Sequence, residues 1–447
     1  MATRSATLIV RNEEVNLAHC LQALQGVVDE IVVVDTGSDD HTVEIARTFT
    51  DHVYFFSWCD DFAAARNFAI ERATSDYVLS VDADERLLNL EQAPELIETF
   101  LGCHGPTVVG TVEIISAAGP GPDAQEVVTE VQRLFRRDGF RFQGTIHEQL
   151  LSLSGVKQAA ATGLQFAHSG YAHAVSSPQH KSHRNKRLLK AAIETHPDDE
   201  YCWYQLGKAH AALGENLEAC MAFEHALNLI RFDGVGASGR IGPVAPEVLT
   251  DLLASSAYAY VNSNQMAKAA ALLTKHETLG HAGVRTPDFY HALGYVHLMA
   301  GDIARSRRAY ETSLGFGTRH EQVLGAGSFS SLYHLGLLCE AEKDLRGACA
   351  HYLQSLRCKH SYGPAIARCI DLILEHRVLA PPEVWAACDP AALAERFRSK
   401  LYSLLNDNRV DQATILLEAA KSISPGLLEQ CSAFLRGLER QTDSPDP

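Results

Sequence analysis

The sequence lacks any block rich in lysine and arginine, any apolar run long enough to cross a membrane, and any cysteine pair spaced C-x-x-C. With a formal net charge of −16, the chain has nothing to offset repulsion from phosphate, which argues against nucleic acid or an anionic membrane surface as a partner. The eleven scattered cysteines indicate reduced thiols instead of a disulfide framework or a zinc site. Because the first residues lead into an apolar strand and not a signal peptide, we expect a soluble cytoplasmic protein with no integral membrane segment.

Motifs that mark other nucleotide-using enzymes are also missing. No G-x-G-x-x-G follows the first apolar run, which disfavours a dehydrogenase. That run leads into Asn12, Glu13 and Glu14 and not into a glycine-rich phosphate loop, which disfavours a nucleotidyltransferase. A processive polysaccharide synthase would carry membrane spans and a Q-x-x-R-W motif, and the sequence has neither.

The first part of the chain alternates strand and helix signals. At 447 residues, 46% of them hydrophobic, the chain is long enough for two or three domains. Its first strands are predicted from four short apolar runs at residues 7–10, 30–35, 53–56 and 77–81. Such alternation predicts an α/β domain with a mostly parallel, Rossmann-like sheet and right-handed crossovers. The later predicted strands look more antiparallel: residues 108–115, 127–135 and 164–168.

An acidic cluster follows the strand predicted at residues 77–81. Side chains alternate along a strand, so Asp82 and Asp84 would point the same way where the strand ends. Two carboxylates at that position suit a hard divalent cation such as Mg²⁺ or Mn²⁺, which in turn suits a nucleotide diphosphate. The alternative is a strand followed by an acidic, solvated turn. Ligands of parallel sheets bind beyond the carboxyl ends of the strands, where Asn12 and Asp35 also fall.

From about residue 185 the chain becomes helical and repeats itself with the spacing of a tetratricopeptide repeat of about 34 residues, which predicts an all-α solenoid. Three copies show the spacing best: Trp203, Leu206, Gly207, His210, Ala219, Phe223 and Ala226; Tyr290, Leu293, Gly294, His297, Ser306 and Tyr310; and Leu332, Leu335, Gly336, Cys339, Ala348 and Tyr352. The alternative is an unrelated helical domain. The predicted organisation is an α/β domain at residues 1–175, a first repeat region at 185–233, a Gly/Pro-rich linker at 234–249, further repeats at 250–440 and a frayed tail at 441–447.

Four motifs in the first domain together resemble family 2 glycosyltransferases with a GT-A fold. They are Leu8-Ile9-Val10-Arg11-Asn12-Glu13-Glu14, Val33-Val34-Asp35-Thr36-Gly37-Ser38-Asp39-Asp40, Ala65-Arg66-Asn67 and Asp82-Ala83-Asp84-Glu85. Three further stretches resemble the bacterial subgroup that fuses this domain to tetratricopeptide repeats and includes peptide S-glycosyltransferases: Trp58-Cys59-Asp60-Asp61-Phe62, Ile146-His147-Glu148 and His168-Ser169-Gly170-Tyr171. The subgroup often has His-His before the Gly-Tyr pair, and here Ala167 stands first.

The resemblance implies a sugar-nucleotide pocket, with a UDP- or GDP-sugar as donor and Mn²⁺ or Mg²⁺ as cofactor. Asp35 would accept a hydrogen bond from the nucleobase, unless it only caps the next helix. Arg66 would clamp phosphate or orient a carboxylate, unless it is a surface arginine. The donor would also be held by two residues of the first motif, Asn12 and Glu14.

Asp82 and Asp84 would hold the sugar nucleotide through its ribose and the metal, with Asp84 as the more direct metal ligand. His168 from a late strand would complete the metal ligands, unless that histidine is simply packed. An inverting transfer also needs a base that deprotonates the acceptor. Glu148 is our candidate, with an ordinary surface carboxylate as the alternative reading. His147 is a rival for that role or for metal ligation, and Glu85 is a third candidate for the base.

Two hypotheses follow. The first is a metal-dependent inverting glycosyltransferase whose repeats recognise a peptide or protein acceptor or assemble a homo-oligomer. The second is a repeat scaffold whose first domain binds a sugar nucleotide without turnover. Loss of some site residues would favour the second, and the sequence retains Asp35, Arg66, Asp82, Asp84 and Glu148.

Overall fold

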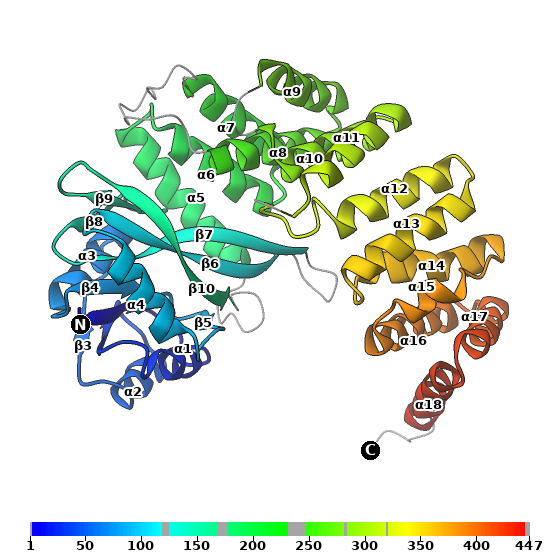
Figure 1. Ribbon diagram of the computed structural model, residues 1–447, viewed down its shortest axis with the longest axis horizontal. Coiled ribbons are helices and arrows are strands. Elements are labelled where there is room, and N and C mark those ends of the chain that lie inside the picture. Colours follow the sequence, from blue (N-terminus) through cyan, green and yellow to red (C-terminus); the bar gives the residue numbers. More distant parts are fainter. Residues whose placement is uncertain are drawn as a thin grey trace. The chain divides into compact units, whose positions relative to one another are not determined.

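The computed structural model describes residues 2–118, 125–168, 178–230, 246–280, 284–318 and 321–442. These residues form two compact units that divide after Gln265. The first unit holds the sheet and helices α1 to α8, and the second holds helices α9 to α18 (Figure 1). Parts of two predicted segments, residues 234–245 of the linker and 443–447 of the tail, lie outside the described residues. Among the described helices, none is long and apolar enough to span a membrane.

An eight-stranded sheet in the order β3-β2-β1-β4-β7-β6-β10-β5 dominates the first unit (Figure 1). The first four strands pair in parallel, as predicted: β1 (Arg4–Val10), β2 (Glu30–Asp35), β3 (Val53–Phe55) and β4 (Tyr77–Ser80). The remaining strands of this sheet are β5 (Glu85–Leu87), β6 (Val108–Ala118), β7 (Gln125–Arg136) and β10 (Gln158–His168). A separate antiparallel pair is formed by β8 (Phe140–Gln143) and β9 (Gln149–Ser152).

The second half of the sheet differs in part from the prediction. Strand β7 is antiparallel to β4 and β6, as expected, but β10 runs parallel to β6. Because β6 and β7 are antiparallel, β6 starts at the end of the sheet where β7 ends. Strand β10 also starts at that end, so it runs parallel to β6. The connection that carries the chain there contains β8 and β9. The short strand β5 and its pairing with β10 were not predicted.

Three of the parallel strands, β1, β2 and β4, are buried on both faces, whereas the edge strand β3 is partly exposed. Val32 and Val34 belong to the apolar core that includes residues of α3 (Phe62–Arg72), whereas Ile31 and Val33 belong to the core that includes residues of α1 (Leu17–Leu24) and α4 (Ala93–Cys103). Alternate residues of one strand thus face opposite helical layers, which explains the unbroken β-branched run in the sequence. Helix α2 (Thr42–Arg47) links β2 to β3.

The helices that directly follow the sheet in the chain pack on this α/β domain. Ile146 is in one apolar cluster with Leu188 and Leu189 of α5 (Pro178–Thr195), and Phe62 packs against that cluster. Helices α6 (Glu200–Ala212) and α7 (Asn216–Leu229) form the first predicted repeat, and α8 (Pro246–Asn262) completes the first unit. The predicted boundary near residues 175–185 therefore lies inside a compact unit.

The second unit is entirely helical in its described part. Its helices are α9 (Met266–Leu279), α10 (Pro287–Met299), α11 (Ile303–Phe316), α12 (Phe329–Ala341), α13 (Leu345–Cys358), α14 (Gly363–His376), α15 (Pro382–Ala386), α16 (Pro390–Asn406), α17 (Val410–Ile423) and α18 (Pro425–Thr442). Pairs α10–α11 and α12–α13 correspond to the second and third predicted repeats. In all three copies the glycine of the first helix faces the aromatic residue of the second: Gly207 with Phe223, Gly294 with Tyr310, and Gly336 with Tyr352.

We expect Gly294→Ala to destabilise the second unit. A Cβ at this position would lie 2.8 Å from Cε1 of Tyr310, whose side chain is fully buried and cannot move aside cheaply. Such overpacking costs about 1–3 kcal/mol. The matched control is Gly315→Ala in α11, where an added Cβ meets nothing within 4 Å. Thermal unfolding followed by circular dichroism should show a lower Tm for the first variant only, and equal Tm values would contradict this packing.

Candidate active site

The carboxyl ends of the parallel strands bring the predicted residues to one edge of the sheet. Asp35 ends β2 beside Val10, the last residue of β1. On the other side of β1, the backbone N–H of Val81 donates to the carbonyl of Thr7 (3.0 Å), so that Asp82 follows directly at the same edge. The predicted location of the site, beyond the ends of β1, β2 and β4, agrees with this arrangement.

Three predicted donor-binding residues organise the turn that follows β2. The Asp35 carboxylate accepts hydrogen bonds from the backbone N–H groups of Gly37 and Ser38, both at 3.1 Å. Asn12 Oδ1 accepts from the N–H of Asp39 (2.9 Å), and Glu14 Oε2 accepts from that of His41 (3.1 Å). Asp35 does not cap the next helix, because α2 begins at Thr42 and its N-cap, His41, makes no side-chain cap hydrogen bond. The nucleotide-binding roles of all three residues stay predictions.

Glu13, which we did not assign to the site, lies near Asp82 and Asp84, whereas we had assigned its neighbour Glu14. Asn16 donates a hydrogen bond to its carboxylate at 2.9 Å. Burial raises the pKa of Glu13, and the nearby charges of Asp84 and Asp82 raise it further, whereas Asn16 and Lys181 oppose them. Asn12 has a positive φ of 56°, which breaks the two-residue alternation of the strand. Sequence alternation alone could not tell which of the two glutamates turns inward.

Arg66 connects the predicted residues. It lies on α3, whose N-terminus is capped by Asp61, and it is buried, so the surface-arginine alternative is wrong. Its Nη2 donates to Asp82 Oδ1 (2.7 Å) and its Nη1 to Ser80 Oγ (3.1 Å). Its Nε donates to Glu148 Oε1. One planar guanidinium thus fixes both the acidic cluster after β4 and the candidate base.

Arg133 on β7 is a second buried guanidinium that we did not predict. Its Nη2 donates to Asp82 Oδ2 (2.8 Å) and to Glu85 Oε1 (2.6 Å). Burial would raise the pKa of Asp82, but the charges of Arg133 and Arg66 outweigh it and hold that pKa well below its usual range. Burial raises the pKa of Glu85 to about 7 against the opposing charge of Arg133. Asp82 is therefore an ionised carboxylate with an arginine on each oxygen.

We expect Arg133→Met to destabilise the first unit by about 3–5 kcal/mol, because the buried carboxylate of Glu85 would lose its cationic partner and Asp82 would lose one of its two arginines. The control is Arg136→Met on the same strand, which removes an exposed ion pair with Asp138 and should change stability by less than about 0.5 kcal/mol. Urea unfolding followed by circular dichroism measures the difference. Equal midpoints for the two variants would show that the buried pair contributes nothing.

Asp84 and His168 form the pair that best fits a metal ion. His168 Nε2 lies 3.1 Å from Asp84 Oδ2, and its Nδ1 lies 3.4 Å from Ser116 Oγ. The pairing of β5 with β10 sets His168 opposite Glu85, next to Asp84 in the chain. Two ligands at about 2.1 Å from one cation, at right angles, would be about 3 Å apart, so the spacing fits one small divalent cation. A nitrogen ligand beside an oxygen ligand suits Mn²⁺ better than Mg²⁺, which prefers oxygen ligands. An outer contact such as that of Ser116 commonly orients a ligating histidine.

Asp82 is less suited to direct ligation than we predicted, because Arg66 and Arg133 occupy its two oxygens. That Asp84 is the more direct ligand stays a prediction, and Asp82 links the acidic edge to the two arginines. The remaining part of the motif that begins at His168, residues 169–171, lies outside the described residues.

The candidate bases differ in their surroundings. Glu148 contacts Arg66 and its side chain is only 12% exposed, so it is not an ordinary surface carboxylate. His147 has a left-handed backbone with φ of 50°, and burial lowers its pKa to about 4, which leaves the imidazole neutral near pH 7. Glu85 is enclosed against Arg133 with 4% of its surface exposed, which makes it the least accessible of the three to an acceptor.

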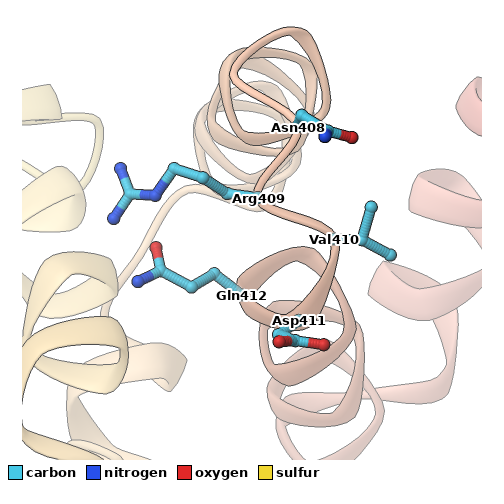
Figure 2. Close-up of a pocket in the computed structure, with 5 residues that line it drawn as sticks. All are labelled: Asn408, Arg409, Val410, Asp411 and Gln412. Carbon is cyan, nitrogen blue, oxygen red and sulfur yellow. The ribbon is translucent and has the colours of Figure 1, made fainter.

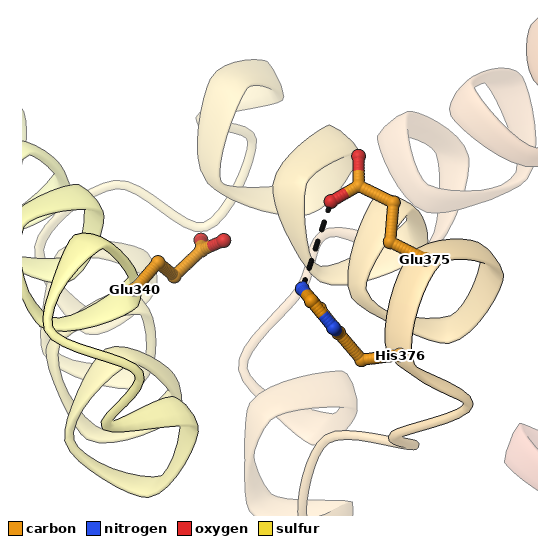
Figure 3. A group of neighbouring side chains, drawn as sticks. All are labelled: Glu340, Glu375 and His376. Carbon is orange, nitrogen blue, oxygen red and sulfur yellow. Dashed lines mark ion pairs between the residues drawn. The ribbon is translucent and has the colours of Figure 1, made fainter.

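Another group of carboxylates and a histidine lies in the second unit. Glu340, Glu375 and His376 offer ligand atoms within 4.8 Å of one another (Figure 3). Arg368, however, donates to Glu340 Oε1 (2.9 Å) and to Glu375 Oε2 (2.9 Å), so a fixed positive charge already lies between the two carboxylates. We interpret this group as an ion-pair network that ties α12 to α14.

The second unit also has a surface hollow of about 270 Å³ at the turn between α16 and α17 (Figure 2). Asn408, Arg409, Val410, Asp411 and Gln412 line it. None of them is a predicted site residue, and we assign no chemistry to this turn.

Comparison with known families agrees with this geometry. Residues 5–148 match the model of glycosyl transferase family 2, and residues 201–233 match a tetratricopeptide repeat. The α/β domain is a family 2 glycosyltransferase domain. The predicted combination of this domain with helical repeats is therefore confirmed, as is the predicted fold class.

The names of curated relatives refer either to tetratricopeptide repeats or to a glycosyltransferase. The chain is 34% identical to a TPR repeat-containing protein of Synechococcus elongatus over 46% of its own length and 52% of the relative. It is 24% identical to the SPbeta prophage-derived glycosyltransferase SunS of Bacillus subtilis over 51% of its own length and 53% of the relative. An uncharacterized glycosyltransferase of Rickettsia typhi is 36% identical over 22% of this chain and 33% of the relative. The chain thus matches about half of the length of the first two relatives.

Proposed function

We propose that the protein is a metal-dependent inverting glycosyltransferase that moves a sugar from a nucleoside diphosphate donor to a peptide, protein or other acceptor. The observation that carries the proposal is the Asp84–His168 pair at the carboxyl edge of a family 2 domain, beside the buried link from Asp82 through Arg66 to Glu148. The name of the relative SunS, a glycosyltransferase, supports the same reaction class.

Asp84 and His168 would hold the cation. When bound, the cation supplies Lewis-acid stabilisation of the charge that grows on the departing diphosphate. Arg66 keeps Asp82 and Glu148 in fixed orientations, which limits the reorganisation needed when the donor binds. Glu148 would accept the proton of the acceptor as it attacks the anomeric carbon from the side opposite the diphosphate.

The helical repeats are proposed to recognise a peptide or protein acceptor or to assemble a homo-oligomer, since repeat arrays of this kind present extended surfaces to protein partners. The cytoplasm is the proposed compartment, because a reducing environment suits the free cysteines found among the described residues. The second candidate function is a scaffold that binds a sugar nucleotide without turnover. The buried pairing of Arg66 with both Asp82 and Glu148 weighs against it, because pure binding gives no reason to hold a candidate base.

A panel of UDP- and GDP-sugars with Mn²⁺ tests the proposal, with released nucleoside diphosphate as the readout. Slow release from one donor, increased by a peptide acceptor and abolished by a chelator, is the expected result. Binding of a nucleotide without release under any condition would favour the scaffold. If no member of the panel binds or reacts, neither function holds.

A further inference from the structure

Lys181, the fourth residue of helix α5, reaches the candidate cation site from the helix that precedes the first repeat. Its Nζ lies 3.5 Å from Asp84 Oδ2, the same oxygen that contacts His168. Its positive charge also lowers the pKa of Glu13, whose carboxylate faces the same edge of the sheet. The ammonium group is thus a cation held by the chain itself within the acidic part of the site.

The position of Lys181 is fixed by contacts elsewhere on α5. Arg187 donates to both oxygens of Asp60 at 2.9 Å, and the guanidinium of Arg184 lies over the ring of Phe62 at 5.1 Å. Leu188 and Leu189 pack into the apolar cluster that contains Ile146, as described above. Because the helix is anchored on the segment before α3 and on the loop that carries Glu148, it places the lysine at Asp84 as part of the fold.

A divalent cation on Asp84 and His168 would compete with the lysine. Asp84 Oδ2 would be in direct contact with the cation at about 2.0–2.2 Å, and two positive charges would then repel each other across a few ångströms. Lysine has a long flexible side chain, and that of Lys181 is 37% exposed, so its ammonium group has room to turn away. The nearest new anion would be the diphosphate that shares the cation.

We propose that Lys181 is a donor-binding residue, whose ammonium group pairs with Asp84 when the cation is absent and with the donor diphosphate when cation and donor are bound. The inference rests on the proposed function, since it assumes a nucleoside diphosphate at this edge. It gives helix α5, which precedes the first repeat, a direct part in the donor site.

The test measures binding, not turnover, in the full-length protein. Titrations with Mn²⁺ alone, and with UDP or GDP in the presence of Mn²⁺, are compared for wild type, Lys181→Met and Lys181→Arg. Lys186→Met is the matched control, because this lysine lies on the same helix and pairs with Glu215 instead (2.7 Å). Circular dichroism and Tm values establish that all variants are folded.

We expect Lys181→Met to weaken nucleotide binding about tenfold or more, which is the effect of losing one charge-assisted hydrogen bond. Mn²⁺ alone should bind equally well or about two- to fivefold more tightly, because a competing ion pair is removed. Lys181→Arg should restore most of the nucleotide affinity, and Lys186→Met should match wild type.

Three results would overturn the role of Lys181 alone: nucleotide affinity of Lys181→Met within twofold of wild type, no recovery in Lys181→Arg, or an equal loss in Lys186→Met. If the wild-type protein binds neither UDP nor GDP with Mn²⁺, the proposed function fails, and the inference fails with it. The wild-type titration therefore separates the two failures.

Discussion

Asp84→Ala is expected to abolish Mn²⁺- or Mg²⁺-supported release of nucleoside diphosphate from the donor. The substitution removes the oxygen that lies 3.1 Å from His168 Nε2 and leaves the histidine as a single ligand. Lewis-acid stabilisation of the leaving group contributes several kcal/mol, so the rate should fall about a thousandfold or more. The measurement is the initial rate of nucleoside diphosphate release at saturating metal, with the donor identified by the panel of sugar nucleotides.

The matched control for this variant is Asp138→Ala, which removes an exposed carboxylate paired only with Arg136 in the contacts described above. Its rate should equal that of wild type. The Tm of Asp84→Ala should stay close to the wild-type value, since the side chain makes its described contacts at the rim of the site with His168 and Lys181. An unaltered metal-dependent rate in Asp84→Ala would refute the metal assignment.

Glu148→Gln is expected to cut sugar transfer about 10²–10⁴-fold while donor binding is retained. The amide oxygen of glutamine can still accept the hydrogen bond from Arg66 Nε, so the arrangement of Arg66 and Asp82 should persist. What is lost is the ability to take a proton from the acceptor. Single-turnover transfer to an acceptor, measured beside UDP or GDP binding, separates the two effects.

His147 provides the comparison for this prediction. His147→Asn suits the left-handed backbone at this position, because asparagine adopts positive φ more readily than most residues. If Glu148 is the base, this variant should transfer sugar far faster than Glu148→Gln. Near wild-type transfer by Glu148→Gln, together with a large loss of transfer in His147→Asn, would identify His147 as the base.

The sequence was sufficient for the parts of the fold that depend on local pattern. Apolar runs with helices between them predicted β1 to β4, their parallel pairing and the edge at which Asp35 and Asp82 lie. The antiparallel character expected of the last strand holds for the pairing of β10 with β5 but not for its pairing with β6, which depends on how the long connection through β8 and β9 crosses the sheet. The strand β5 has only three residues, which is too short for an alternation pattern to predict it from the sequence.

The site residues that sequence analysis missed are those whose partners are distant in the chain. Arg133 pairs with Asp82 across 51 positions, and nothing around it in the sequence distinguishes it from Arg136 on the same strand. Lys181 belongs to a helix with several basic residues, and only the docking of α5 selects it. The Asp84–His168 pair was predicted, but through family resemblance and not through spacing.

The sequence motif predicted a shared role for Asp82 and Asp84, and the structure gives them different partners. Alternation along a strand placed Asp82 and Asp84 together, yet the two carboxylates have different partners: arginines for Asp82, and a histidine and a lysine for Asp84. This difference separates an orienting carboxylate from a candidate cation ligand. It follows from β7 and α5, which carry Arg133 and Lys181 to the same edge.

The central claim is that this edge of the sheet holds a divalent cation beside the donor diphosphate. Crystals grown with Mn²⁺ and UDP or GDP, measured at the manganese absorption edge, test it most directly. We expect an anomalous peak about 2.0–2.3 Å from a carboxylate oxygen of Asp84 and from Nε2 of His168, in contact with diphosphate oxygens. A nucleotide bound with no peak there, or with manganese held by other residues, would contradict it.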